Sequence, residues 1–458
     1  MTPSAGQVMY VPLGGTGEIG MNLNMYGTDG QWLMIDCGMM MDRGASTDEV
    51  IVPDASFAVA HKDDLAGIVL THAHMDHIGA LSWIWPSLQC PIYATPYTAA
   101  VVLRELSSQL PPLLLQHLPI ITVSSAKPIN IGPFEVEWVN LTHSIPEPNA
   151  IILRSAAGTV FHTGDWKIDP HPVLGDTIDE RYLRRIGQKG VNALVGDSTN
   201  STRVGSSGSE SSLIEPLKNL CATTTGRVVV SCFASNVARL CTLGRAAEAT
   251  GRRLCLLGVG LEKTVSTARQ LGLWPQDLPW VPAQHVGYLP REEVLAVATG
   301  SQGENRAALA RLAAGYHRDL ELEAGDRVIF SARRIPGNEA LIERMIERFR
   351  ARDIEVIEDG EKTTHVSGHP HRDELAQMYG WLKPRAVIPT HGEPEHLQAN
   401  ARVAKESGVP VTLDARNGDV CVISGGPTGI VGQIPSGRVR IDRRYTVPST
   451  DRSLEIKS

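Results

Sequence analysis

The stretch THAHMDHIGA, residues 71–80, gathers three histidines and one aspartate into six consecutive positions, namely His72, His74, Asp76 and His77. The apolar run before it, Gly67–Leu70, is typical of a buried strand, and we expect a helix to begin at Ile78–Leu81. Side chains on a strand-to-helix turn leave a rigid sheet edge and converge on one point. Four ligand-type residues at such a turn predict a metal site.

Other residues must complete that site, because a pair of metal ions needs more ligands than one turn can offer. Zinc favours histidine nitrogen and carboxylate oxygen, and a hydrolytic site keeps one position open for water. Three further candidates follow apolar stretches at expected strand ends: His143, Asp165 and His391. Alone, each would be read as an ordinary structural residue. Beside the cluster, they are expected to be ligands.

The composition limits the class of protein. A length of 458 residues with 42% hydrophobic and 20% charged residues is typical of a globular chain of two or three domains, with no membrane span and no secretory signal. Seven scattered cysteines without a C-x-x-C pair favour a reduced, cytoplasmic protein. The net charge of -7 argues against a surface that binds nucleic acid everywhere. Contacts with nucleic acid would therefore concentrate in a local cleft.

The pattern of strands and helices changes along the chain. Short strands dominate the first two hundred residues, whereas strands alternate with long helices after residue 206, as in a doubly wound parallel sheet. A second histidine-rich region follows Gly360, which favours an insertion into a single metal-binding domain. The predicted parts are a first domain segment at 1–205, an inserted domain at 206–361, a second segment at 362–445 and a loosely held tail at 446–458.

One motif suggests a different ligand. Gly15-x-Gly17-x-x-Gly20 follows a strand and matches the dinucleotide-binding fingerprint, with Asp36 downstream. That fingerprint requires a helix next, because the helix N-terminus binds the pyrophosphate. The residues that follow instead predict a β-hairpin. We therefore expect these glycines to pack beneath the metal site.

Several motifs together carry a resemblance to a known family. They are GGTGEIGMN, the histidine cluster, THSIP, HTGDWKID, GDSTN, FASN, TGSQGE, IPGNE, HVSGH and PTHGE, in that order. The sequence resembles the metallo-β-lactamase fold, its β-CASP branch, and specifically the bacterial ribonuclease J family, from about residue 8 to about residue 440. The resemblance implies an α/β fold, an αββα sandwich with an inserted, doubly wound β-CASP domain. Family members usually continue into a further C-terminal domain, so we expect a monomer or a weak homodimer here.

The resemblance also implies which residues bind metal. One Zn²⁺ would be held by His72, His74 and His143, the other by Asp76, His77 and His391, with Asp165 bridging both. Mn²⁺ or Mg²⁺ would substitute for zinc or support activity. Asp36 would orient the ligating histidines through hydrogen bonds.

For the chemistry, the resemblance implies the catalytic residues Asp76, His369 and Asp197. His369 would protonate the leaving 3′ oxygen, and Asp197 would keep it protonated and aimed. The loop of His365, Val366, Ser367, Gly368 and His369 would hold a phosphate of the substrate. A tight turn that merely positions His369 is the alternative for this loop.

These residues predict a zinc-dependent ribonuclease that degrades single-stranded, 5′-monophosphorylated RNA from 5′ to 3′, with some internal cleavage, in RNA processing and decay. Its decay-complex partners are not predicted. A β-CASP nuclease acting on DNA would share every ligand. A catalytically silent RNA-binding subunit would be expected to lack ligands, and an esterase of small substrates is disfavoured by the insertion that would roof the site.

Overall fold

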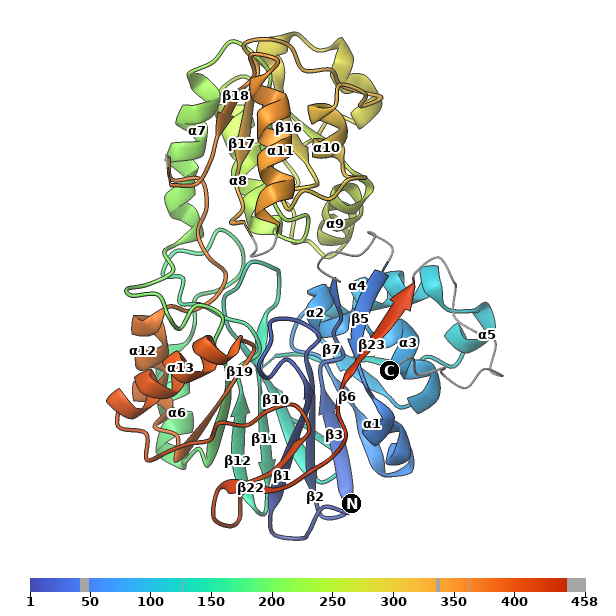
Figure 1. Ribbon diagram of the computed structural model, residues 1–458, viewed down its shortest axis with the longest axis vertical. Coiled ribbons are helices and arrows are strands. Elements are labelled where there is room, and N and C mark those ends of the chain that lie inside the picture. Colours follow the sequence, from blue (N-terminus) through green and yellow to red (C-terminus); the bar gives the residue numbers. More distant parts are fainter. Residues whose placement is uncertain (42–48, 126, 335–337, 361, 443–458) are drawn as a thin grey trace.

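The computed structural model has two lobes, one above the other in Figure 1. It describes residues 1–41, 49–125, 127–334, 338–360 and 362–442. The predicted tail at 446–458 and residues 335–337 of the IPGNE motif lie outside the described residues. Within the described residues, no helix combines the length and the apolar character needed to cross a membrane.

The lower lobe contains two large sheets. The eight-stranded sheet has the order β22 (Gly429–Gln433), β21 (Asp419–Ser424), β1 (Val8–Gly14), β2 (Leu23–Thr28), β3 (Gln31–Ile35), β6 (Leu65–Val69), β7 (Ile92–Ala94) and β8 (Ile120–Thr122). The seven-stranded sheet has the order β20 (Val411–Thr412), β19 (Ala386–Thr390), β13 (Ala193–Asp197), β12 (Gly158–His162), β11 (Asn149–Ser155), β10 (Phe134–Asn140) and β9 (Ile129–Ile131). The two sheets pack face to face through one shared apolar cluster.

Strand β1 shows why the sheets form a sandwich. Its side chains alternate between two faces, as the two-residue period of a strand requires. Val8 and Tyr10 join the cluster between the sheets, whereas Val11 and Leu13 join the cluster on the opposite face. Each sheet therefore needs a helical layer on its outer side.

Helices supply these outer layers. The first sheet is covered by α1 (Ser56–Ala60), α2 (Met75–Ile78), α3 (Leu81–Leu88), α4 (Pro96–Gln109) and α5 (Pro112–Leu115). The second is covered by α6 (Glu180–Lys189), α12 (Arg372–Leu382) and α13 (Pro394–Glu406). The predicted αββα sandwich is confirmed. A small sheet of β23 (Arg438–Asp442), β5 (Glu49–Pro53) and β4 (Met40–Met41) was not anticipated.

The upper lobe is built on a five-stranded, fully parallel sheet. Its order is β15 (Arg253–Leu257), β16 (Val294–Ala298), β14 (Val228–Ser231), β17 (Arg327–Phe330) and β18 (Glu355–Ile357). Around it stand α7 (Ile214–Ala222), α8 (Val237–Ala249), α9 (Val259–Gln270), α10 (Ala308–Ala313) and α11 (Glu339–Arg350). Short 3₁₀ helices in this part of the chain are η2 (Glu210–Leu213), η3 (Ala283–Tyr288) and η4 (Arg291–Glu293), whereas η1 (Lys62–Asp64) lies in the lower lobe directly before β6.

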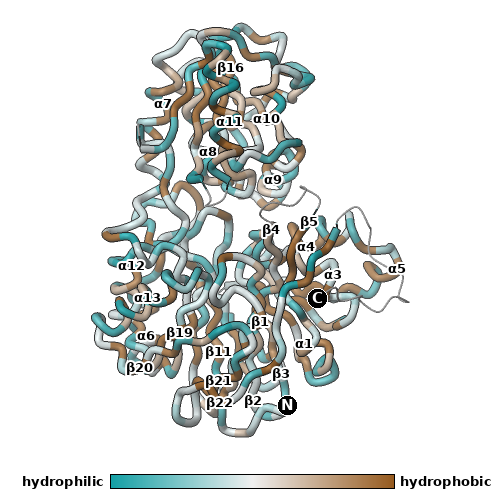
Figure 2. The backbone as a smooth tube through the Cα atoms, viewed as in Figure 1, coloured by the Kyte–Doolittle hydropathy of each residue, from teal (hydrophilic) through white to brown (hydrophobic). Residues whose placement is uncertain are grey.

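Helices lie on both faces of this sheet, as a doubly wound fold requires. Val228 and Val230 cluster with residues of α7, α8 and α9, whereas Val229 clusters with residues of α10 and α11. Figure 2 shows hydrophobic residues along the strands and inner helix faces, and hydrophilic residues at the outer connections. The predicted doubly wound fold of the inserted domain is therefore confirmed, while its boundaries at 206 and 361 stay a prediction.

Candidate metal centre

Helix α2 presents the second half of the histidine cluster. It begins at Met75 and ends at Ile78, and this short helix was not expected, because the sequence predicted the first helix start at Ile78–Leu81. Three backbone N–H groups explain the early end, because they bind the carbonyls of this short helix: Met39 to Met75 at 3.0 Å, Asn22 to Asp76 at 2.9 Å and Cys37 to His77 at 2.7 Å. The main helix of this region, α3, starts afresh at Leu81.

The first group of possible ligands is His72, His74, His143 and Asp165, whose ligand atoms all lie within 4.8 Å of one another. His74 Nδ1 lies 3.1 Å from the Nε2 atoms of both His72 and His143. Asp165 Oδ2 lies 3.8 Å from His72 Nε2 and 3.7 Å from His143 Nε2. Four atoms from three separate segments therefore face one point.

The second group is Asp76, His77, Asp165 and His391, again within 4.8 Å of one another. His391 Nε2 lies 3.1 Å from Asp76 Oδ2 and 3.8 Å from Asp165 Oδ1. His77 Nε2 lies 3.2 Å from Asp165 Oδ2. Asp165 belongs to both groups, one carboxylate shared between two sites.

Hydrogen bonds orient the histidines from behind. His77 Nδ1 lies 2.7 Å from Asp36 Oδ2, whose carboxylate also accepts from the backbone N–H of Thr71. His391 Nδ1 lies 2.7 Å from Thr199 Oγ1, and His72 Nδ1 lies 3.0 Å from Thr71 Oγ1. Such partners fix which ring nitrogen faces the metal.

The charges of the ligands differ between the two groups. Burial lowers the pKa of His74 to about 4, and burial beside other histidines lowers the pKa of His72 well below its ordinary value. These rings are neutral, which is the form that binds a metal. Burial also opposes charge on His77, yet the carboxylates of Asp165 and Asp36 outweigh it and raise the pKa of His77 well above its usual range.

The residues fit two divalent cations. Asp165 is 2% exposed, and its Oδ1 atom has no hydrogen-bond partner among the described residues. A buried carboxylate oxygen without a partner is costly unless a cation engages it. Nitrogen and carboxylate donors around one shared carboxylate form the donor set that zinc favours.

A third group overlaps the second: Asp165, Asp197, His369 and His391 could also hold an ion. Within it, His369 Nδ1 lies 2.8 Å from Asp197 Oδ2 and 3.9 Å from Asp165 Oδ2. Burial opposes charge on His369, but Asp197 and Asp165 raise its pKa above the ordinary value. The structure thus brings His369 and Asp197 together as expected, at the edge of the metal groups.

The loop at residues 365–369 lies directly against these ligands. The carbonyl of Gly368 lies 2.5 Å from His143 Nδ1. A Cβ atom at Gly368 would meet the His143 ring at 2.8 Å, so this close approach explains the glycine. Ser367 Oγ accepts from Asn200 Nδ2 at 2.7 Å, and His365 Nδ1 is buried without a hydrogen-bond partner in the described chain. Val366 packs against the apolar core, so only its backbone can face a ligand.

The glycine-rich motif near the N-terminus supports the metal groups and begins no helix. Strands β2 and β3 form a hairpin whose turn residues, Asp29 and Gly30, have φ values of 47° and 82°. The carbonyl of Gly15 accepts from the backbone N–H of His391 at 2.6 Å. A Cβ atom at Gly15 would lie 2.2 Å from Asn22 Oδ1. The prediction of close packing beneath the site therefore holds for Gly15, whereas a Cβ atom at Gly17 would meet nothing within 4 Å.

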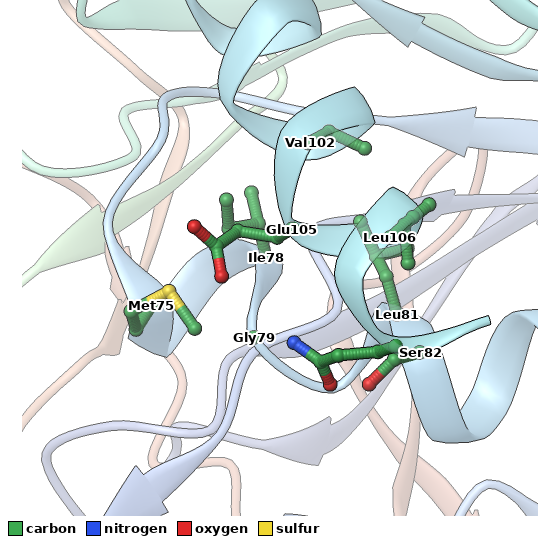
Figure 3. Close-up of a pocket in the computed structure, with 9 residues that line it drawn as sticks. Met75, Ile78, Gly79, Leu81, Ser82, Val102, Glu105 and Leu106 are labelled. Atoms are coloured by element: carbon green, nitrogen blue, oxygen red, sulfur yellow. The ribbon is translucent and has the colours of Figure 1, made fainter. Parts of the chain in front are cut away.

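An apolar gap behind α2 is too small for a ligand. Figure 3 shows it between α2, α3 and α4, lined by Met75, Ile78, Gly79, Leu81, Ser82, Val102, Glu105, Leu106 and Gln109. Its volume of about 10 Å³ holds at most one water molecule.

Comparisons with known proteins identify the family. Three family models match: the metallo-beta-lactamase superfamily at residues 22–178, the ribonuclease J beta-CASP domain at 225–349, and the Zn-dependent metallo-hydrolase RNA specificity domain at 353–413. Ribonuclease J of Sinorhizobium meliloti is 43% identical over 95% of this chain and 78% of its own length. The chain belongs to the ribonuclease J family. This places it among the metal-dependent hydrolases that act on RNA.

Other relatives agree with this assignment. Ribonuclease J of Mycolicibacterium smegmatis is 34% identical over 98% of this chain and 80% of its own length. Ribonuclease J of Helicobacter pylori B128 is 35% identical over 98% of the chain, which spans 65% of that relative. A crystal structure of a protein of unknown function from Enterococcus faecalis V583 aligns with a TM-score of 0.64 at 14% identity, covering 91% of this chain and all of its own, and supports the fold alone.

Sequence reasoning missed several residues that contact the predicted site residues. Ser235 Oγ lies 3.1 Å from His74 Nε2, so the upper lobe contacts a predicted ligand directly. Thr199 binds His391, and Asn200 binds Ser367. All three residues lie in motifs already noted in the sequence, FASN and GDSTN. These motifs indicated where site residues would lie but did not indicate what each residue contacts.

Proposed function

We propose that this chain is a two-metal ribonuclease that degrades single-stranded, 5′-monophosphorylated RNA from 5′ to 3′, with slower internal cuts. One observation carries the proposal: two ligand groups share Asp165 and lie beside the pair of His369 and Asp197. Zn²⁺ is the proposed metal, with Mn²⁺ or Mg²⁺ able to support activity. The match to an RNA specificity domain favours RNA over DNA as substrate.

The proposed ligands divide as the two groups do. His72, His74 and His143 would hold one cation, Asp76, His77 and His391 the other, and Asp165 both. When bound, such a pair lowers the pKa of water toward ~7 and offsets charge on the phosphoryl oxygens. The chain's own residues orient the ligands, because strand ends place Asp165 and His391, helix α2 carries Asp76 and His77, and hydrogen bonds fix the rings of His72, His77 and His391.

His369 is the proposed general acid. Its Nδ1 atom is engaged by Asp197, so Nε2 is the atom left to exchange a proton. As water attacks phosphorus, the bond between phosphorus and the 3′ oxygen breaks, and His369 gives its proton to that oxygen. Asp197 favours the charged ring before transfer, which explains the raised pKa of His369.

The loop at 365–369 is the proposed cradle for the 5′ phosphate. Breaking the bond to the 3′ oxygen leaves the phosphate on the remaining strand, so every cut creates a new 5′-monophosphate end. A cradle for that group therefore favours stepwise degradation. The buried Nδ1 of His365, which lacks a partner in the described chain, supports a polar ligand at this place.

The experiment compares one RNA carrying a 5′ monophosphate, triphosphate or hydroxyl with the matching DNA. A 5′ hydroxyl leaves the cradle donors unpaired at a cost of roughly 1–3 kcal/mol, so it should react about 5- to 150-fold more slowly. A triphosphate is bulkier and more charged than one cradle can hold, so it should also react more slowly. Ser367→Ala should remove this preference, whereas Ser108→Ala, at an exposed position of α4, should not. Equal rates on all three RNA ends would show that the enzyme is chiefly an endonuclease. Faster cleavage of DNA than of RNA would show that DNA is the substrate.

The proposed place of action is the cytoplasm. All seven cysteines are buried and free, as suits a reducing compartment.

A further inference from the structure

Glu374 lies where three segments of the chain meet. It is the third residue of α12 and is 1% exposed. Its Oε1 atom accepts from the backbone N–H of Ile168 at 2.8 Å and from Ser207 Oγ at 2.7 Å. Its Oε2 atom accepts from the backbone N–H groups of Ser207 and His371, both at 2.8 Å. One buried carboxylate thus takes four hydrogen bonds.

Each of these partners belongs to a segment with a place in the site. Ile168 is three residues after Asp165, the carboxylate shared by both metal groups. Ser207 lies in the segment that leads from β13 of the lower lobe to α7 of the upper lobe, which is called the crossover below. His371 is two residues after His369, at the end of the phosphate loop. Glu374 therefore joins the Asp165 loop to the His369 loop through a single side chain.

Helix capping alone does not account for these contacts. A capping box needs only the bond from the third residue of the helix to the backbone N–H of the N-cap, here His371. The other three bonds come from segments 167 and 206 positions away in sequence. Because a buried carboxylate must have its oxygens paired, this arrangement holds those segments at fixed distances.

The crossover has further anchors that do not involve Glu374. Lys167 Nζ donates to the carbonyl of Gly208 at 2.8 Å. Asp169 accepts from Ser209 Oγ at 2.6 Å and from the backbone N–H of Glu210 at 2.8 Å. Loss of Glu374 should therefore leave the upper lobe attached and free chiefly the loop that carries His369.

We propose that Glu374 is a positioning residue that fixes His369 and the phosphate loop relative to Asp165. The inference rests on the proposed function, in which His369 gives a proton at the bond held by the metal groups. A general acid must lie within hydrogen-bond reach of its target, and an error of about 1 Å can cost 10²-fold in rate. Glu374 would act on turnover through His369, without touching substrate.

The test uses Glu374→Gln with Asp326→Asn as its matched control. Each oxygen of Glu374 takes two donors, so either orientation of the Gln amide turns its NH₂ group toward two donors. Asp326 is also fully buried and accepts backbone N–H bonds from Arg227 and Glu323, but it lies in the upper lobe away from the metal groups. Below the melting temperature of both variants, Glu374→Gln should lower kcat by ~10- to 100-fold with metal content retained, and Asp326→Asn should leave kcat unchanged.

A double-mutant cycle shows whether the effect passes through His369. Once His369→Ala has removed the acid, adding Glu374→Gln should cost little more turnover, because coupled residues do not add. Equal losses in both backgrounds, or a lower melting temperature with unchanged kcat, would overturn the inference. If Glu374→Gln does not fold, Ser207→Ala replaces it in the double-mutant cycle, because this substitution removes one of the four hydrogen bonds of Glu374. The same outcomes then support or overturn the inference.

A second readout does not depend on activity. In the metal-free protein, Glu374→Gln should increase hydrogen–deuterium exchange at residues 365–371, and Asp326→Asn should not. Unchanged exchange there would count against the positioning role. A wild-type protein that leaves RNA intact, together with increased exchange in Glu374→Gln, would refute the proposed function and keep the positioning role.

Discussion

Asp36→Asn should weaken one metal site and spare the other. Asp36 is fully buried and has a φ of 61°, a left-handed conformation that asparagine also tolerates. Its Oδ2 atom lies 2.7 Å from His77 Nδ1, and its Oδ1 atom accepts from the backbone N–H of Thr71 at 2.9 Å. The asparagine oxygen can keep the bond to Thr71, which turns the NH₂ group toward His77.

The magnitude follows from the tautomer of His77. An NH₂ donor at Nδ1 makes that atom the acceptor and moves the proton to Nε2, the atom that faces Asp165. A protonated nitrogen cannot bind a metal. Loss of such an outer hydrogen bond typically costs 10- to 100-fold in metal affinity, or about 1.4–2.7 kcal/mol.

The assay is a competition titration of metal-free protein against a chromogenic chelator. Wild type should take up two cations, whereas Asp36→Asn should keep one affinity and lose ~10- to 100-fold on the other. Asp419→Asn, at another buried carboxylate of the lower lobe, is the control. Titration curves of Asp36→Asn and wild type that superimpose would refute the role of Asp36, and so would equal weakening of both sites.

Three further predictions test the site and the fold. Asp165→Ala should lower metal content and activity together. His369→Ala should keep both metals, as metal analysis would show, and should lose ~10²–10⁴-fold in turnover. Loss of metal from His369→Ala would instead show that His369 is a ligand. Burial raises the pKa of all seven cysteine thiols, for example that of Cys232 to about 12. A thiol reagent should therefore label no cysteine quickly in the native protein and all seven in urea. Rapid labelling of the native protein would contradict this burial. Arg239→Met leaves the buried carboxylate of Glu210 unpaired and should lower the free energy of unfolding by ~3–5 kcal/mol in urea denaturation, so an unchanged midpoint would show the ion pair to be unimportant.

Local patterns made part of the site predictable from the sequence. The histidine cluster lies within six positions, so its convergence depends only on one turn. Asp165, Asp197 and His391 could be placed at strand ends because the apolar runs before them are unambiguous. Their assignment to particular metals rested on the family resemblance.

Contacts between distant segments could not be predicted in the same way. The bond of Glu374 to Ile168 joins residues 206 positions apart, and that of Ser235 to His74 joins residues 161 apart. The early end of α2 depends on carbonyls that bind N–H groups near residues 22–39. No periodicity along the chain encodes such pairings, since each depends on how separate elements pack.

The positions of the metal ligands and of His369 are secured in different ways. Strands β12, β13 and β19 are parallel neighbours, and Asp165, Asp197 and His391 lie at or just beyond their carboxyl ends. Their spacing is therefore set by the hydrogen-bond ladder of one sheet. His369 follows β18 of the other lobe after a long loop, and the side chain of Asp197, at the end of β13, holds its ring beside the ladder. Substitutions in the segment that carries His369 should consequently reduce turnover while metal binding persists, whereas substitution of Ser235, which contacts His74, should also affect a predicted ligand.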